Sequence, residues 1–206
     1  MIGRTPLILL VSAPSGAGKT TVGEALLGHA PNLRRVITCT TRALRGSEVP
    51  GVDYHFLSAD DFSGRVARGE FLEYATVYGR SYGTLKSSVL ELLGEGRDVL
   101  LIIDVQGAAS VRQAAQSDPI LARALVTVFL TPPTLSELGQ RLRGRGSDSE
   151  DSLRCRLEAA RSEAARWTEF DYLLRSDTRE ADLTRLRAIY EAESLRRDRQ
   201  DFQLAD

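Results

Sequence analysis

The sequence of 206 residues is poor in cysteine and has no long apolar segments. Its two cysteines, Cys39 and Cys155, are too few and too far apart for a disulfide framework or a structural zinc site. No apolar run approaches the roughly 20 residues that a membrane-spanning helix needs. The first residues show no apolar segment followed by a cleavage site. These absences predict a reduced, cytoplasmic protein that does not enter a membrane.

An excess of charge of one sign is also missing. Lysine plus arginine number 27 and aspartate plus glutamate 28, which gives a formal net charge of −1. This balance creates no overall field that would draw the chain to nucleic acid or to an anionic membrane. Lysine itself is scarce, because Lys19 and Lys86 are the only two among the basic residues. Arginine is so common that a single arginine needs a second reason before it counts as a ligand.

A phosphate-binding pattern lies close to the start of the sequence. An apolar run over residues 7–11 leads into G-A-G-K-T at residues 16–20. The segment matches G-x-x-x-x-G-K-[ST] except that Ala13 replaces the first glycine. Backbone N–H groups of such a loop surround phosphates at the positive end of the following helix. Lys19 would reach the terminal phosphates and Thr20 could bind Mg²⁺; the alternative is a helix start that is merely rich in glycine.

Short apolar runs alternate with helical patterns along the chain. Buried strands are expected at residues 7–11, 99–103, 126–130 and 172–174, and helices at 20–27, 108–115 and 181–197. This alternation predicts an α/β fold, a P-loop NTPase-type parallel sheet flanked by helices.

Two stretches depart from this rhythm and predict insertions. Residues 37–94 combine strand-like segments with tight turns, and Thr84 is expected to cap a helix there. Residues 134–167 are helical, with capping boxes that begin at Thr134 and Ser147 around a glycine-flanked joint. We therefore expect a core of about residues 1–36, 95–133 and 168–206, a mixed α/β insertion at about 37–94, and a hinged helical flap at about 134–167.

Several side chains outside the phosphate loop are candidate ligands. Asp104 directly follows the apolar run 99–103, so it is expected at the same sheet edge as the loop. It could hold Mg²⁺ or bind substrate, or it could only cap the next helix. Arg42 and Arg45, three residues apart around a turn, can bracket one phosphate with forked hydrogen bonds. Tyr54 could bind the same phosphate, although ordinary strand packing explains it equally well.

The motifs occur in an order that resembles the guanylate kinase family over nearly the whole chain. The matching segments are residues 14–21, Thr40-Thr41-Arg42, Arg45-Gly46, Asp53-Tyr54, Glu70-Phe71-Leu72-Glu73, Tyr82-Gly83-Thr84, Ile103-Asp104-Val105-Gln106-Gly107 and the arginine-rich segment 141–146. The resemblance implies a GMP-binding subdomain in the first insertion and a lid in the second. It implies a Mg²⁺-dependent transfer of the ATP γ-phosphoryl group to GMP in purine nucleotide metabolism and GMP recycling. The substrates would be ATP and GMP, with dGMP possible, and the protein a monomer or homodimer.

The resemblance also assigns roles to single residues. It implies that ATP is bound by Ala13, Pro14, Ser15, Gly16, Ala17, Gly18, Lys19, Thr20, Thr21 and Ser176, and Mg²⁺ by Thr20 and Asp104. The catalytic cations would be Lys19, Arg141, Arg145 and Arg156. The GMP phosphate would be bound by Arg42, Arg45, Tyr54 and Tyr82, and guanine or its surroundings by Thr38, Glu73, Thr84 and Asp104.

The chemistry of two of these residues can be examined separately. Guanine presents its N1–H and N2 amine side by side, and the carboxylate of Glu73 can accept both hydrogen bonds. Adenine has no such pair of donors, so a buried Glu73 would be left unpaired beside it. Ser176 departs from the asparagine that the family often has near the adenine ring, which leaves the selection of the donor base open.

Two rival functions remain at this stage. One is a kinase for a different nucleoside monophosphate. The other is a guanylate-kinase-like binding module that recognises phosphorylated protein segments without catalysis. Such a module would be expected to lose the phosphate loop or the lid arginines, whereas this chain has Lys19, Thr20, Arg141 and Arg145.

Overall fold

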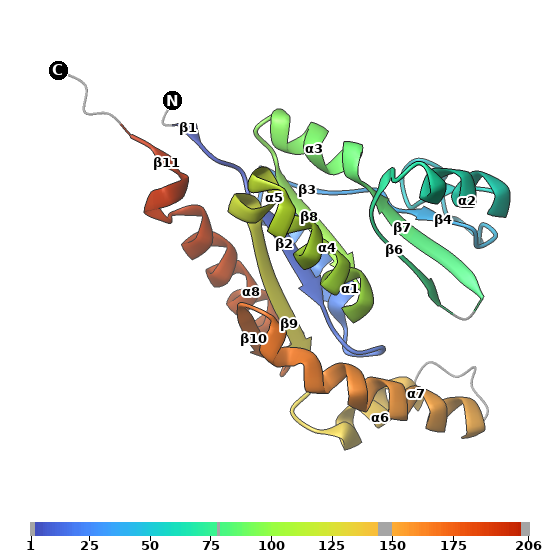
Figure 1. Ribbon diagram of the computed structural model, residues 1–206. Helices are drawn as coiled ribbons and strands as arrows, with labels where there is room; N and C mark the ends of the chain where they lie inside the picture. The colour runs from blue at the N-terminus through green and yellow to red at the C-terminus, as the bar shows by residue number, and fades with distance from the viewer. Residues whose placement is uncertain (1–2, 78, 144–149, 203–206) are drawn as a thin grey trace.

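A parallel β-sheet forms the centre of the computed structural model, which describes residues 3–77, 79–143 and 150–202 (Figure 1). In the described residues, its strand order is β10-β9-β2-β8-β3. The strands are β2 (Ile8–Ser12), β3 (Leu33–Arg35), β8 (Asp98–Ile103), β9 (Leu125–Thr131) and β10 (Tyr172–Arg175). The apolar runs predicted four of them to within one residue at each end. Strand β3 was not expected, because an edge strand with two arginines forms no apolar run.

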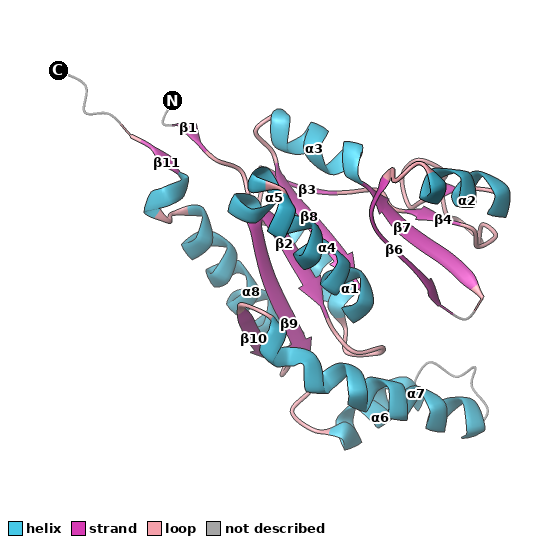
Figure 2. Cartoon of the chain, viewed as in Figure 1, coloured by secondary structure: helices cyan, strands magenta, loops and turns pink. Residues whose placement is uncertain are grey.

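Helices cover both faces of this sheet (Figure 2). Leu9 and Val11 on one face of β2 belong to the same apolar cluster as α1 (Lys19–Leu27) and α8 (Arg179–Ser194). Ile8 and Leu10 on the other face belong to a second cluster. That cluster includes side chains of α3 (Lys86–Gly94), α4 (Val105–Ser117) and α5 (Pro119–Ala124). The predicted fold class, a parallel sheet flanked by helices, is confirmed.

The first insertion contains a second, mixed sheet in the order β5-β4-β7-β6. Its elements are β4 (Cys39–Thr40), β5 (His55–Phe56), α2 (Ala59–Ala67), β6 (Phe71–Val77) and β7 (Arg80–Leu85). The expected cap at Thr84 is wrong. Residue Leu85 precedes the first turn of α3 without a side-chain cap. Thr84 lies inside β7, where strand register directs its hydroxyl toward β6.

The second insertion is a pair of helices below the sheet in Figure 1. They are α6 (Leu135–Arg143) and α7 (Glu150–Ala164), followed by the 3₁₀ helix η1 (Ala165–Glu169). The cap at Thr134 is confirmed, since the N–H of Glu137 donates to its hydroxyl at 3.2 Å. The second expected cap, Ser147, lies outside the described residues. Among the described helices, none is long and apolar enough to cross a bilayer.

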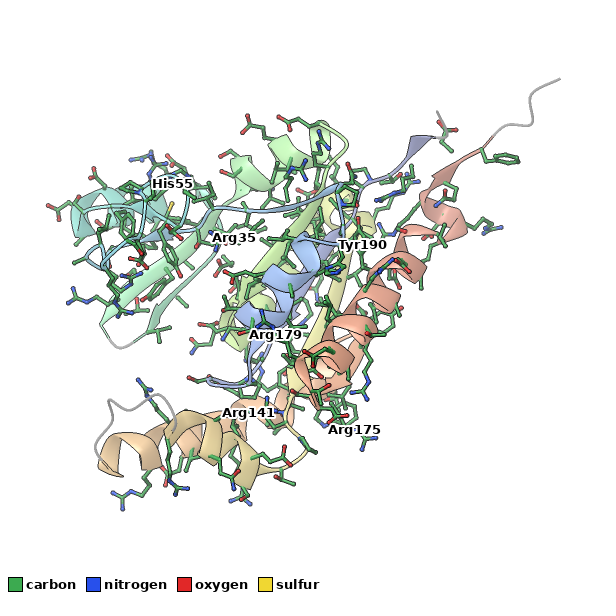
Figure 3. All side chains as sticks on the ribbon, turned by 180° about the vertical axis from the view of Figure 1, so that it is seen from behind. Arg35, His55, Arg141, Arg175, Arg179 and Tyr190 are labelled. Atoms are coloured by element: carbon green, nitrogen blue, oxygen red, sulfur yellow. The ribbon has the colours of Figure 1, made fainter. Side chains whose placement is uncertain are left out.

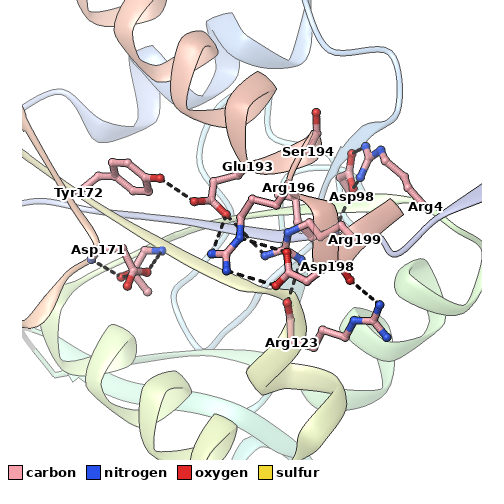
Figure 4. A network of polar contacts seen from close by, with 12 residues as sticks. Arg4, Asp98, Arg123, Asp171, Tyr172, Glu193, Ser194, Arg196, Asp198 and Arg199 are labelled. Atoms are coloured by element: carbon pink, nitrogen blue, oxygen red, sulfur yellow. Dashed lines mark hydrogen bonds and ion pairs between the residues drawn. The ribbon is translucent and has the colours of Figure 1, made fainter. Parts of the chain in front are cut away.

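The last helix of the chain ends earlier than expected. Helix α8 stops at Ser194, not near residue 197, and the chain continues as η2 (Arg197–Arg199) and β11 (Gln200–Asp201). Strand β11 pairs antiparallel with β1 (Gly3–Arg4). Arg199 is buried and donates to the carbonyl of Arg123 at 2.8 Å (Figure 4). This segment is therefore folded onto the core.

Asp98, at the start of β8, is completely buried beside this segment. It accepts hydrogen bonds from the guanidinium of Arg4 (Figure 4). It also accepts from the N–H of Leu7 at 2.9 Å and from the hydroxyl of Tyr190 at 2.6 Å. Burial and the Asp98 carboxylate both raise the pKa of Tyr190. These hydrogen bonds join the N-terminal segment and α8 to the start of β8. This end of the sheet is opposite the end at which the loops follow the strands.

Candidate active site

The phosphate loop connects β2 to α1 at the carboxyl edge of the central sheet. Gly16 and Gly18 have φ angles of 86° and 99°, left-handed values that residues with a Cβ rarely adopt. Gly18 immediately precedes α1, and the N–H of Val22 donates to its carbonyl at 3.2 Å. The helix therefore begins at Lys19, with its positive end at the loop. The predicted order of strand, loop and helix is confirmed.

Thr20 and Asp104 are the two expected magnesium ligands. Thr20 is exposed in the first turn of α1, and Asp104 follows β8. Their hydroxyl and carboxylate oxygens fit Mg²⁺, which prefers oxygen ligands and commonly keeps waters and phosphate oxygens as well. Within the part of the chain that the structure describes, no group of three or more His, Cys, Asp or Glu side chains could hold a metal ion.

Asp104 also caps a helix. Its Oδ1 accepts a hydrogen bond from the N–H of Gly107 at 2.8 Å at the start of α4. The capping role that the sequence left open is therefore present. A role of the second oxygen toward Mg²⁺ or substrate stays a prediction.

Glu73, the expected reader of guanine, is buried between the insertion and the core. Only 5 % of its surface is exposed, and the hydroxyl of Thr84 donates to its Oε1 at 2.6 Å. Gly107 lies directly against the other oxygen, because a Cβ at this glycine would stand 2.6 Å from Oε2. Burial, with a smaller contribution from the Asp104 charge, raises the pKa of Glu73 to about 7. The pocket thus brings Glu73, Thr84 and Asp104 together, as expected.

Arg42 lies in an aromatic pocket of the insertion and is 8 % exposed. Its guanidinium lies 5.3 Å from the centre of the Tyr54 ring, and the rings of Tyr54 and Tyr82 are 6.3 Å apart. It forms a two-pronged ion pair with Glu48, at 2.7 and 3.0 Å. Hydrogen bonding to Arg42 lowers the pKa of Glu48. Three of the four expected phosphate ligands therefore come together around one guanidinium.

The remaining expected GMP ligands are less well enclosed. The side chain of Arg45 is exposed, and its backbone N–H donates to Glu48 at 2.8 Å. Thr38 is half-buried immediately before β4, and its carbonyl accepts from the N–H of His55 at 2.9 Å. The roles of Arg45 and Thr38 in binding GMP stay predictions.

The lid contacts the phosphate loop through Arg141 of α6. One guanidinium nitrogen donates to the carbonyl of Ala17 at 3.2 Å and to the hydroxyl of Ser176 at 3.0 Å (Figure 3). Arg156 is half-buried on α7. Arg145 lies outside the described residues. Arg141 thus joins the helical insertion to the phosphate loop.

Ser176 lies in the wall of a cavity of about 210 Å³ beside the loop. Its hydroxyl donates to Asp182 at 2.6 Å and accepts from Arg141, so its single proton is directed into the protein. Figure 3 shows Arg141 and Arg179 on the lid and core sides of this region. The cavity is lined by Ala17, Gly18, Thr21, Val22, Arg141, Ser176, Asp177, Arg179 and Asp182.

Three acidic residues of the site were missed by sequence reasoning. They are Glu48 beside Arg42, Asp182 beside Ser176, and Glu163 of α7, whose carboxylate accepts from the N–H of Ser15 at 3.2 Å. Glu48 lies three residues after Arg45 in the same turn, and this spacing is a signal that could have identified it. Glu163 has no comparable signal, because charged residues occur all along its helix.

Comparisons with known proteins agree with this geometry. The family model described as guanylate kinase matches residues 3–193. A guanylate kinase of Paramagnetospirillum magneticum is 43 % identical over 97 % of this chain and 90 % of its own length. One of Anaeromyxobacter dehalogenans is 46 % identical over 92 % of this chain and 82 % of its own.

A solved structure supports the same assignment. The crystal structure of guanylate kinase from Anaplasma phagocytophilum superposes with a TM-score of 0.77 at 28 % identity. The match covers 97 % of this chain and 92 % of that one. The similarity thus extends through both insertions as well as the core. The chain belongs to the guanylate kinase family.

Proposed function

We propose that the protein transfers the γ-phosphoryl group of ATP to GMP and releases ADP and GDP. One observation carries this proposal: a buried carboxylate suited to guanine and a carboxylate bonded to the phosphate loop both lie near Asp104. Asp104 links the two sites, since its charge acts on Glu73 in the insertion and on Glu163, which is bonded to the loop. A guanine held at Glu73 would extend its phosphate toward the loop.

The base would be selected by hydrogen bonding. Ionised Glu73 accepts hydrogen bonds from guanine N1–H and the N2 amine, while the hydroxyl of Thr84 holds the carboxylate in place. Because the pKa of Glu73 is about 7, the carboxyl group is partly protonated in neutral solution. Binding of two guanine donors would favour its ionised form. AMP offers no such pair of donors and would leave the buried group unpaired.

The acceptor phosphate would bind in the aromatic pocket around Arg42. There it would share or replace the Glu48 carboxylate on the guanidinium, with the phenol groups of Tyr54 and Tyr82 close by. The exposed Arg45 would supply a second cation. A phosphate monoester is already anionic, so the reaction needs no residue to remove a proton from the nucleophile.

The donor site would position and neutralise the triphosphate. A GMP phosphate oxygen attacks the γ-phosphorus, and the bond from γ-phosphorus to the bridging oxygen breaks, so that ADP leaves with the electron pair. Lys19, Arg141 and Arg156 would stabilise the charge on the transferred group, and Arg145 is assigned the same role. Mg²⁺ held by Thr20 and Asp104 would add positive charge at the phosphates.

The wider organisation is part of the same proposal. We assign residues 37–94 to a GMP-binding subdomain and residues 134–167 to a lid that closes over both nucleotides and excludes water. Cytoplasmic location is supported by the sparse cysteine content and by the buried free thiol of Cys39. A monomer or homodimer would suffice, because one chain carries all the proposed ligands.

A coupled assay of ADP formation tests the proposal. The assay uses ATP as the donor, with Mg²⁺ present, at pH 8, where Glu73 is largely ionised. It compares five acceptors: GMP, dGMP, AMP, CMP and UMP. We expect kcat/KM for GMP to exceed that for AMP by at least a hundredfold, the order that one unpaired buried group produces. Equal turnover of AMP would contradict guanine selection. No ADP with any monophosphate would favour the non-catalytic binding module.

A further inference from the structure

A carboxylate of the lid lies on the phosphate loop. Glu163, in the last turn of α7, accepts a hydrogen bond from the backbone N–H of Ser15 through Oε2 at 3.2 Å. Ser15 precedes the left-handed Gly16 in the loop. Such loops use their backbone N–H groups to bind phosphate oxygens. The carboxylate of Glu163 therefore accepts a hydrogen bond from an N–H group of the kind that binds phosphate oxygens.

The surroundings of Glu163 show where on the triphosphate it would act. The charges of Lys19 and Asp104 both act on Glu163. Lysine of this motif serves the terminal phosphates, and Asp104 lies toward the guanine pocket. The group that passes from ATP to GMP must lie between these two residues. A residue that is bonded to the loop at Ser15 and influenced by both charges is therefore expected to lie near the terminal phosphate of bound ATP.

We propose that the Glu163 carboxylate takes the position of the γ-phosphate of ATP at the Ser15 N–H. This contact holds the lid against the loop until ATP binds. This proposal rests on the ATP site proposed above. A carboxylate and a γ-phosphate cannot share one N–H at close range, because two anions about 4 Å apart repel each other strongly in a partly buried site. ATP must therefore displace Glu163. ADP lacks the γ-phosphate and leaves the contact in place.

The contact would make the lid respond to the phosphorylation state of the nucleotide. Arrival of ATP separates Glu163 from Ser15, while Arg141 on α6 can still contact the loop at Ala17. Transfer of the γ-phosphoryl group removes the competing anion, and Glu163 returns to Ser15. Because ATP must displace Glu163 and ADP need not, the contact lowers the affinity of the loop for ATP relative to ADP. The phosphorylation state of the nucleotide and the lid contact are therefore linked.

The Glu163→Gln variant tests this competition. Glutamine keeps the length and an acceptor oxygen for Ser15 but removes the negative charge. We expect the Kd for ATP, measured by calorimetry with Mg²⁺ and without GMP, to fall about five- to tenfold. The Kd for ADP should change less than twofold. Glu158→Gln is the matched control, because it removes the same charge from an exposed position of α7, and both Kd values should stay within twofold.

The ratio of the two Kd values decides the outcome. An unchanged ATP to ADP ratio in Glu163→Gln would overturn the proposal, and so would an equal shift in Glu158→Gln. Glu163→Ala provides a second variant without any acceptor and should shift the ratio in the same direction. If the proposed ATP site itself were wrong, Lys19→Ala would bind ATP and ADP as tightly as wild type does. That outcome is distinct from an unchanged ratio of the two Kd values in Glu163→Gln.

Discussion

The GMP-binding insertion and the lid place their functional side chains in opposite settings. In the insertion, two of the charged candidate ligands are buried: Arg42 is 8 % exposed and Glu73 is 5 % exposed. In the lid, the buried residues are apolar, such as Leu138 and Ala160, which join the core cluster beside α1 and α8. The charged side chains of the lid reach the loop from its surface.

This difference suggests a division of labour between selection and movement. Burying Glu73 costs desolvation, which raises its pKa, but leaves a group that tolerates only a matching donor. Arg141 of the lid is only half-buried, so water can compensate part of the loss when its contacts to Ala17 and Ser176 separate. This contrast supports the proposal of an acceptor site that is built before GMP binds and a donor site that contacts of the lid complete.

The largest expected effect comes from Lys19, which belongs only to the donor side. Lys19→Ala should lower kcat by at least about a thousandfold, because it removes a cation from the transferred phosphate. GMP affinity should change less than threefold, since the proposed GMP site lies in the insertion. Calorimetry with GMP and the coupled assay measure the two quantities.

The chain supplies a matched control for this substitution. Lys86 is the only other lysine, and it pairs with Asp118 at 2.9 Å on the surface of α3. Lys86→Ala should leave turnover within twofold. A loss of GMP affinity as large as the loss of turnover in Lys19→Ala would mean that the two sites are not separate.

The next largest effect tests the buried acceptor site. Glu73→Gln keeps the size but places an amide NH₂ opposite the N2 amine of guanine, donor against donor. GMP should lose about 2–4 kcal/mol in kcat/KM at pH 8, and AMP should lose far less. Equal losses for both nucleotides would show that Glu73 has only a structural role.

Arg42→Ala provides the contrasting variant within the same insertion. It removes a phosphate ligand, and a phosphate carries no information about the base. The kcat/KM values for GMP and AMP should therefore fall by the same factor. A selective loss of GMP turnover in this variant would place Arg42 near the base.

The sequence predicted the features that depend on residues close together in the chain, and it missed those that depend on contacts between distant residues. The phosphate loop follows from spacing alone, and four strands follow from apolar runs. Thr84 was placed at a helix start because helix signals surround it, but cross-strand pairing with Glu73 decides where its hydroxyl lies. Such pairing joins residues 11 positions apart and leaves no periodic trace.

Longer-range partners were harder to predict for the same reason. Glu163 meets Ser15 across 148 positions, and its helix carries other acidic residues that look alike in sequence. The last helix was expected to reach residue 197, yet α8 ends at Ser194, and Arg199 is buried against the carbonyl of Arg123. A charged residue gives no sign in sequence that a backbone carbonyl elsewhere will receive it.

The third expected effect concerns the pH dependence of stability. Glu73 has a pKa of about 7 in the folded chain against an ordinary value of 4.5. Its contribution to stability is therefore complete below about pH 4.5 and is lost as the pH rises to about 7. The change amounts to about 3 kcal/mol. Glu73→Gln does not titrate, so its free energy of unfolding relative to wild type should rise across that window.

Urea unfolding at pH 5 and pH 8 measures this change. Glu70→Gln is a useful control from the same insertion, because hydrogen bonding to Arg68 lowers the pKa of Glu70. This shift acts only below about pH 4.5, so the free energy of unfolding of Glu70→Gln relative to wild type should stay nearly constant between pH 5 and pH 8. A parallel pH dependence of wild type and Glu73→Gln would show that Glu73 is not desolvated.

The smallest expected effect tests how tightly the acceptor pocket is built. Gly107→Ala places a methyl group 2.6 Å from Oε2 of Glu73, so the carboxylate must move away from its position beside Thr84. GMP should lose about 1–2 kcal/mol in kcat/KM, the lower part of the range for overpacking, while ATP affinity stays unchanged. Gly94→Ala is the control, because no atom lies within 4 Å of its added Cβ. If Gly107→Ala left GMP turnover intact, the pocket would be adaptable, and the contrast between a prebuilt acceptor site and a movable lid would lose its basis.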